Sequence, residues 1–106
     1  MTDDWRDVCR VDEVPVGEVG RFEPPGLPPL AVYNVDGRFY ASDDCCTHEQ
    51  AMLSEGTLDG EVIECPFHGG RFSVVTGEVV ARPPIRPLRI YPVRVEGETV
   101  RIQASE

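Results

Sequence analysis

The sequence predicts an all-β fold, an antiparallel β-sandwich or barrel. The first observation is a series of short runs rich in β-branched and aromatic residues, with turn residues between them. The second is the abundance of residues that interrupt helices, ten prolines and ten glycines in 106 residues. The third is the scarcity of helical patterns: nothing in the first 44 residues resembles a helix, and only 50–54 is expected to form a helical turn.

The N-terminal third is expected to hold a strand, a turn and a loop. Residues 5–11 alternate large apolar and polar side chains weakly, at the two-residue period of a strand, and 14–18 form a turn. Cys9 lies inside the first run and is most simply a small buried hydrophobic residue. The segment 24–29 holds four prolines and is expected to be a loop of polyproline character.

Three hairpins are predicted in the rest of the chain. In the first, the β-prone runs 30–35 and 38–41 are joined by Asp-Gly, the strongest short-range hairpin signal. The same dipeptide lies within 58–63, where a second hairpin is expected. A third is expected over 93–102, where apolar and polar residues alternate on both sides of a glycine.

Length and charge restrict the function classes. A chain of 106 residues has room for one domain, expected over 1–106, and not for a flavin or nucleotide site of ordinary size. The net charge of −9 disfavours nucleic acid and anionic membranes as partners. The N-terminus does not resemble a signal peptide, and no apolar run approaches the roughly 18 residues of a membrane span. We therefore expect a cytoplasmic protein that binds neither nucleic acid nor membrane.

Most of the negative charge lies in the middle of the chain. Residues 36–64 carry eight acidic residues and one basic residue, a net charge of −7. One interpretation is a solvated face that keeps the protein soluble. The other is a docking surface for basic partner proteins.

Two short units bring cysteine and histidine together. The only two histidines each follow a cysteine closely, in Cys46-Thr47-His48 and in Cys65-Pro66-Phe67-His68. Cysteines in a cytosolic chain more often bind metal or stay inert than pair as disulfides. Thiolate and imidazole together suit zinc, copper or an iron–sulfur centre. The alternative without function is two buried thiols beside two hydrogen-bonded histidines.

The mixed composition of each unit distinguishes between metals. Structural zinc sites usually place their cysteines on one knuckle and their histidines on a helix, whereas here each loop offers one of each. Mixed pairs on two facing loops suit a binuclear centre, because each loop can supply one ligand to each metal. Two histidines in place of two cysteines on one iron is the ligand count of a Rieske [2Fe–2S] cluster.

The chain resembles the Rieske ferredoxin components of bacterial aromatic-ring-hydroxylating dioxygenases, such as the biphenyl, cumene and carbazole systems. The resemblance runs from about residue 5 to the end of the chain. The motifs that carry it are Cys46-Thr47-His48, Leu53-Ser54-x-Gly56-x-Leu58-x-Gly60, Glu64-Cys65-Pro66-Phe67-His68-Gly69, and Phe72 through Gly77.

This resemblance implies one [2Fe–2S] cluster in a small cluster-binding subdomain of about 43–73. Cys46 and Cys65 would bind one iron, and His48 and His68 the other. Cys45 also precedes the first histidine, but the family pattern favours Cys46 as the ligand. The prolines of 83–87 resemble the loop that covers such clusters.

The resemblance also implies a role as a one-electron carrier. The chain would pass electrons from an NAD(P)H-dependent ferredoxin reductase to a terminal ring-hydroxylating oxygenase in aromatic compound catabolism, through transient contacts and as a monomer. It is not expected to be an enzyme, because an oxygenase needs a second iron held by further histidines, and both histidines of this chain are already used. Two alternatives remain open: a Rieske-like small subunit of an assimilatory nitrite reductase, and a zinc-stabilised interaction module.

The same comparison predicts a low reduction potential. High-potential members carry a disulfide between the ligand loops and hydroxyl groups beside the cluster. This chain has Phe67 at one of those cysteine positions, and Gly70 and Phe72 at the hydroxyl positions. Fewer hydrogen-bond donors and a negative surface stabilise the added electron less, so we expect about −150 mV.

Overall fold

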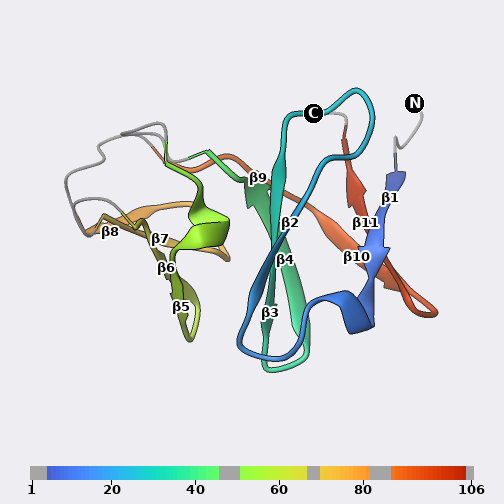
Figure 1. The fold of residues 1–106 in the computed structure, drawn as a ribbon, viewed down its shortest axis with the longest axis horizontal. Helices are drawn as coiled ribbons and strands as arrows, with labels where there is room; N and C mark the ends of the chain where they lie inside the picture. Colours follow the sequence, from blue (N-terminus) through green and yellow to red (C-terminus); the bar gives the residue numbers. More distant parts are fainter. Residues whose placement is uncertain (1–4, 46–50, 67–69, 82–86, 105–106) are drawn as a thin grey trace.

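The structure, a computed structural model, describes residues 5–45, 51–66, 70–81 and 87–104. In these residues eleven strands and two short 3-10 helices form three antiparallel sheets (Figure 1). The prediction of an all-β antiparallel fold is confirmed. Within the described residues, no helix has the length and apolarity needed to cross a membrane.

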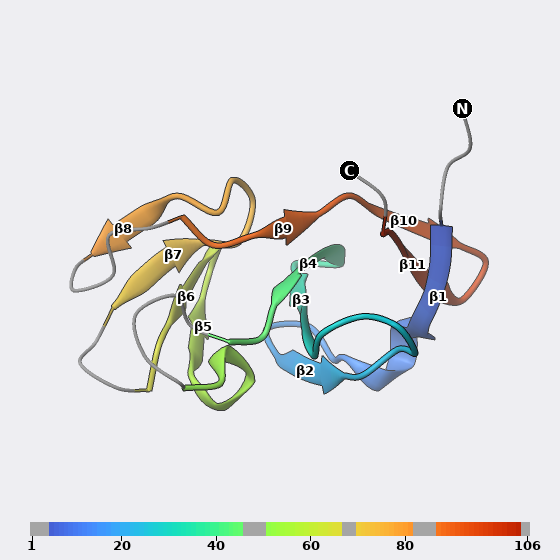
Figure 2. The same cartoon turned by 90° about the horizontal axis from the view of Figure 1, so that it is seen from above.

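The three sheets follow one another along the molecule, as two perpendicular views show (Figures 1 and 2). The sheet at one end has the order β1-β11-β10 and contains β1 (Trp5–Arg10), β10 (Val93–Glu96) and β11 (Thr99–Gln103). The central sheet has the order β2-β3-β4-β9 and contains β2 (Val19–Phe22), β3 (Leu30–Val35), β4 (Arg38–Asp43) and β9 (Ile90–Tyr91). The third has the order β5-β6-β7-β8 and contains β5 (Thr57–Asp59), β6 (Val62–Glu64), β7 (Arg71–Ser73) and β8 (Val79–Ala81).

All three predicted hairpins are present, as β3–β4, β5–β6 and β10–β11. In the first, Asp36 and Gly37 both have positive φ angles, 53° and 90°. Positive φ at both positions is the type I′ turn, whose twist matches that of the flanking strands, and this explains the Asp-Gly pair. The proline-rich segment lies between β2 and β3 and contains no strand, as predicted.

The structure also contains elements that the sequence did not predict. The strands β2, β7, β8 and β9 are only two to four residues long, and they are stabilised by pairing with neighbours rather than by a pattern of their own. A 3-10 helix, η1 (Val11–Glu13), lies in the region where no helix was expected. The main-chain N–H of Arg10 donates to Glu13 Oε1 at 2.8 Å and stabilises this single turn.

Two hydrophobic clusters form the core. One lies around β1, β11 and the central sheet: Cys9, Val14, Leu30, Val32, Ala41, Tyr91, Val100 and Ile102. The other joins the central sheet to the third sheet: Ala31, Tyr33, Ala51, Leu53, Ile63, Cys65, Phe72, Val74 and Leu88. Cys9 is 8% exposed on β1, so the prediction of a small buried residue is confirmed.

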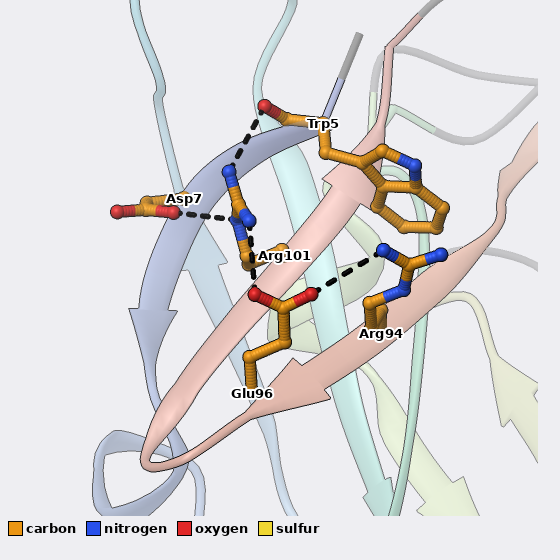
Figure 3. A network of polar contacts seen from close by, with 5 residues as sticks. All are labelled: Trp5, Asp7, Arg94, Glu96 and Arg101. Carbon is orange, nitrogen blue, oxygen red and sulfur yellow. Dashed lines mark hydrogen bonds and ion pairs between the residues drawn. The ribbon is translucent and has the colours of Figure 1, made fainter. Parts of the chain in front are cut away.

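A polar network connects the edges of the first sheet (Figure 3). The Arg101 guanidinium on β11 lies 2.8 Å from a carboxylate oxygen of Asp7 and 3.0 Å from one of Glu96. Arg94 contacts Glu96 at 3.3 Å and stacks on the Trp5 ring at 4.3 Å from its centroid. Hydrogen bonds from Arg101, then from Arg94, hold the pKa of Glu96 below its ordinary value. The network thus joins β1 to the C-terminal hairpin.

Candidate metal centre

The second Cys–His unit connects β6 to β7 at one end of the molecule. Cys65 follows β6 directly and is 2% exposed. Its main-chain N–H donates to the carbonyl of Gly70 at 2.7 Å, and the preceding residue, Glu64, is paired with Arg71 across the strands. The chain between Cys65 and Gly70 therefore begins and ends at hydrogen-bonded positions, and it contains His68, which lies outside the described residues.

The first Cys–His unit also lies between two segments that are hydrogen-bonded to each other. Cys45 and Met52 form an antiparallel bridge, and the N–H of Leu53 donates to the carbonyl of Asp44 at 2.7 Å. Residues 46–50 lie between these positions and outside the described residues, and they include Cys46 and His48. The side chain of Cys45 is exposed, in contrast to the buried Cys65.

A buried carboxylate lies where the first loop begins. Asp44 is fully buried, and both of its oxygens face Ser54 in the 3-10 helix η2 (Leu53–Glu55). Oδ1 accepts the main-chain N–H of Ser54 at 2.7 Å, and Oδ2 accepts its hydroxyl at 2.9 Å. The Arg21 guanidinium on β2 lies 3.5 Å from Oδ2. A buried charge needs such partners, because losing hydration is otherwise very unfavourable.

The two loops are held against each other where the first ends and the second begins. Gly56 follows η2, and a Cβ at this position would overlap the main-chain carbonyl oxygen of Glu64, the residue before Cys65. The residue after Gly56, Thr57, is paired with Glu64 between the antiparallel strands β5 and β6. The absence of a side chain at Gly56 therefore allows this close approach of the two segments.

The surroundings of Cys65 fit a metal-bound thiolate. It belongs to the same hydrophobic core cluster as Leu53, Phe72 and Ile63, which are fully buried and apolar. A free thiolate is disfavoured in such surroundings, so the sulfur is either a neutral thiol or a thiolate whose charge a metal compensates. Sulfur and imidazole donors on two adjoining loops are the donor set that an iron–sulfur cluster of the Rieske type requires.

Of the four predicted ligands, the structure describes Cys65 alone. Cys46, His48 and His68 lie outside the described residues, as do 83–86 of the predicted proline loop. Among the residues that are described, no group of three or more His, Cys, Asp and Glu side chains is placed to hold a metal ion. The structure thus describes the residues that flank both ligand loops and shows that they contact one another.

The negative segment 36–64 does not form one continuous loop surface. Asp36 lies in the β3–β4 turn, whereas Asp59 and Glu61 lie at the β5–β6 turn. Asp44 is buried and paired with Arg21. Only part of the −7 charge is therefore available to a partner that docks on the ligand loops.

Comparison of the sequence with known proteins identifies the family of the chain. The family described as "Rieske [2Fe-2S] domain" matches residues 4–92. The chain belongs to this family. Ferredoxin CarAc of Metapseudomonas resinovorans is 50% identical over 99 residues, which are 92% of each chain. The biphenyl dioxygenase ferredoxin subunit of Pseudomonas sp. (strain KKS102) is 48% identical over 98 residues, 92% of this chain and 89% of the relative.

The likeness to solved structures agrees with this family. A chain in the complex of reduced oxygenase and oxidised ferredoxin in carbazole 1,9a-dioxygenase superposes with a TM-score of 0.90 and 45% identity, over 99% of this chain and 97% of that chain. The relatives are ferredoxin components, which transfer electrons and do not catalyse the reaction themselves. This Rieske protein is accordingly an electron-carrying ferredoxin with one [2Fe–2S] cluster. The zinc-stabilised module is not what the family describes.

Sequence reasoning missed the residues that hold the loops in place. In the sequence, Asp44 is one acid of a negative segment, and nothing in its neighbours predicts that it is buried. Ser54 and Gly56 belong to the Leu-Ser-x-Gly pattern that carries part of the family resemblance. That pattern marked the two positions as characteristic, but their partners, Asp44 and Glu64, became apparent only in the structure.

Proposed function

We propose that this ferredoxin accepts electrons from an NAD(P)H-dependent reductase and donates them to a terminal ring-hydroxylating oxygenase in the breakdown of an aromatic compound. It would act as a cytoplasmic monomer that binds its two partners in turn. The complex of oxygenase and ferredoxin in carbazole 1,9a-dioxygenase supports the oxygenase as a partner, because nearly the whole of this chain superposes on a chain of that complex. The proposal of an aromatic substrate is supported by the relatives, which belong to carbazole, biphenyl and naphthalene dioxygenase systems.

For the cluster we propose four ligands within one domain, in a cluster-binding part of about 43–73. Cys46 and Cys65 would hold one iron, and His48 and His68 the other. The observation that carries this assignment is Cys65, a buried thiol on a loop closed by hydrogen bonds and adjoining the end of the first loop. The exposed position of Cys45 supports its neighbour as the ligand.

Cysteine variants test the ligand assignment. Cys46→Ser and Cys65→Ser are expected to lose visible colour, bound iron and acid-labile sulfide, because each removes a thiolate ligand. Cys45→Ser and Cys9→Ser provide matched controls, one exposed and one buried, and both should retain the cluster. A Cys45→Ser protein without colour beside a coloured Cys46→Ser protein would reverse the assignment. Stoichiometric zinc in a colourless, EPR-silent wild-type protein would contradict the cluster altogether.

Reconstitution tests the proposed partners. The ferredoxin should couple NAD(P)H oxidation by a dioxygenase-system reductase to product formation by a carbazole-type oxygenase. Cys65→Ser, which is expected to lack the cluster, should leave both partners uncoupled. Equal product formation with and without the ferredoxin would contradict the proposed role.

A further inference from the structure

A buried aspartate lies two residues before a proposed cluster ligand and does not contact solvent. Three polar or charged residues of the described chain are buried, Asn34, Ser42 and Asp44, and only the last is charged. A carboxyl side chain contributes little to hydrophobic packing. Removing a carboxylate from water is unfavourable for stability even where it is hydrogen-bonded, so the arrangement needs another explanation.

The contacts of Asp44 join the two ends of the first ligand loop. On the side where the loop begins, the residue is fixed by its own N–H, which donates to the carbonyl of Pro29 at 3.0 Å. On the side where the loop ends, its carbonyl accepts from Leu53, and its carboxylate accepts from both the N–H and the hydroxyl of Ser54, at 2.7 and 2.9 Å. One residue thus satisfies two successive main-chain N–H groups of η2.

The charge of Asp44 also connects this loop to the central sheet. Arg21 on β2 lies 3.5 Å from Oδ2 and reaches Glu23 at 3.3 Å with its other end. The helix η2 contacts β2 and β3, and it lies between the central and third sheets in both views (Figures 1 and 2). The carboxylate therefore holds the loop to the part of the molecule that does not carry the proposed ligands.

We propose that Asp44 is a positioning residue for the cluster: its carboxylate, through Ser54, sets the separation of the two ends of the loop that carries Cys46 and His48. The inference rests on the ligand assignment proposed above. Groups that orient metal ligands without touching the metal change metal affinity by about 10- to 100-fold when removed. Loss of this carboxylate should therefore loosen the cluster even where the sheets remain folded.

Variants at both partners test the inference. Asp44→Asn keeps the side-chain shape and removes the charge, and Ser54→Ala removes only the hydroxyl donor. Both should release iron to a chelator faster, Asp44→Asn by about tenfold or more, and both should shift the g values of the reduced protein in EPR. Ser54→Thr retains the hydroxyl and should return both readings to those of wild type.

Two control variants separate positioning from charge and from stability. Asp59→Asn removes the same charge at an exposed position of the third sheet, and its iron release should stay within about twofold of wild type. Val100→Ala opens a cavity in the hydrophobic core cluster around β11, far from the proposed ligands. It should therefore lower the melting temperature while leaving the EPR g values of the reduced protein unchanged.

The inference fails if Asp44→Asn and Ser54→Ala release iron at the wild-type rate with unchanged g values. Should Asp44→Asn not accumulate as a folded protein by circular dichroism, Ser54→Ala and Ser54→Thr decide, and a Ser54→Ala protein identical to wild type overturns the inference. The ligand assignment is tested separately. If Cys46→Ser and Cys65→Ser retain their iron, that assignment fails, whereas normal behaviour of the Asp44 and Ser54 variants alone leaves the assignment intact.

Discussion

Gly56 and Glu64 lie so close that a Cβ on the first would overlap the main-chain carbonyl oxygen of the second. Gly56 ends the short helix after the first ligand loop, and Glu64 precedes Cys65 at the start of the second. The closeness of the two loops therefore depends on one position without a side chain. It is a tertiary contact between segments that each have ordinary local structure.

Gly56→Ala is expected to destabilise the protein and to weaken cluster binding. The new methyl group must move the backbone of β6 or η2, and such overpacking costs about 1–3 kcal/mol of the free energy of unfolding. Urea unfolding and iron release to a chelator measure the two effects. Gly97→Asn is the control, because Gly97 has a φ of 63°, which asparagine tolerates, and open space around its Cα. Equal stability of the two variants would show that the close approach relaxes easily.

The midpoint potential of the cluster is expected at the low end of the Rieske range, about −150 mV. Phe72 is fully buried and belongs to the same hydrophobic core cluster as Cys65. Its side chain offers no hydroxyl to a sulfur. Without such donors the reduced form is stabilised less. Redox titration followed by EPR gives the value. A midpoint above about +100 mV would place the protein with the high-potential members instead.

Electron transfer to a basic partner is expected to slow as ionic strength rises from low values to about 0.15 M, because salt screens attraction between exposed charges. Glu55 lies in η2, directly after the first loop, and is exposed. Glu55→Gln should reduce the salt dependence of the second-order rate. Glu98→Gln removes the same charge in the β10–β11 turn, where Glu98 pairs with Arg10, and serves as the control. A rate independent of salt would indicate that apolar contacts dominate docking.

The network around Glu96 predicts a pH-dependent contribution to stability. Hydrogen bonds from Arg101 and Arg94 lower the pKa of Glu96, so the ionised form stabilises the folded state. This contribution is complete above the unfolded pKa of about 4.3 and is lost as the pH falls through the lower folded pKa. Glu96→Gln should thus be less stable than wild type at pH 7, and the difference should shrink in acid.

Trp5, the single tryptophan and a member of this network, reports urea unfolding by its fluorescence. Glu61→Gln removes the same charge in the third sheet and serves as the control. A Glu96→Gln protein with the wild-type urea midpoint at pH 7 would show that solvent screens the network completely.

Cys9 is expected to be inert toward thiol reagents in the native protein. Burial, and secondarily the charge of Glu13, raise the pKa of Cys9 to about 12. At pH 8 roughly one molecule in ten thousand then carries the reactive thiolate. In a Cys45→Ser background, iodoacetamide should modify Cys9 only after unfolding, as peptide mass spectrometry would show. Rapid native modification at this position would contradict the burial of Cys9.

The local parts of the fold were predictable from sequence. Asp-Gly between β-prone runs predicts the β3–β4 and β5–β6 hairpins. In the first hairpin the Asp-Gly pair itself forms the turn, whereas in the second Asp59 ends β5 opposite Val62 and the turn residues are Gly60 and Glu61. Donor chemistry limited the two Cys–His units to zinc, copper or an iron–sulfur centre, and the family motifs around them predicted the [2Fe–2S] cluster. Both conclusions needed no knowledge of distant contacts.

Other features were decided by the tertiary structure. The two-residue strand β9 exists because it pairs with β4, which lies about 50 positions earlier in the chain. Asp44 appears in the sequence as one acid among eight, yet the fold buries it and directs it at Ser54. Turn chemistry and ligand chemistry reside in adjacent residues and are visible in sequence. Burial, cross-strand pairing and close backbone approach depend on which distant segments meet, and only the folded chain determines that.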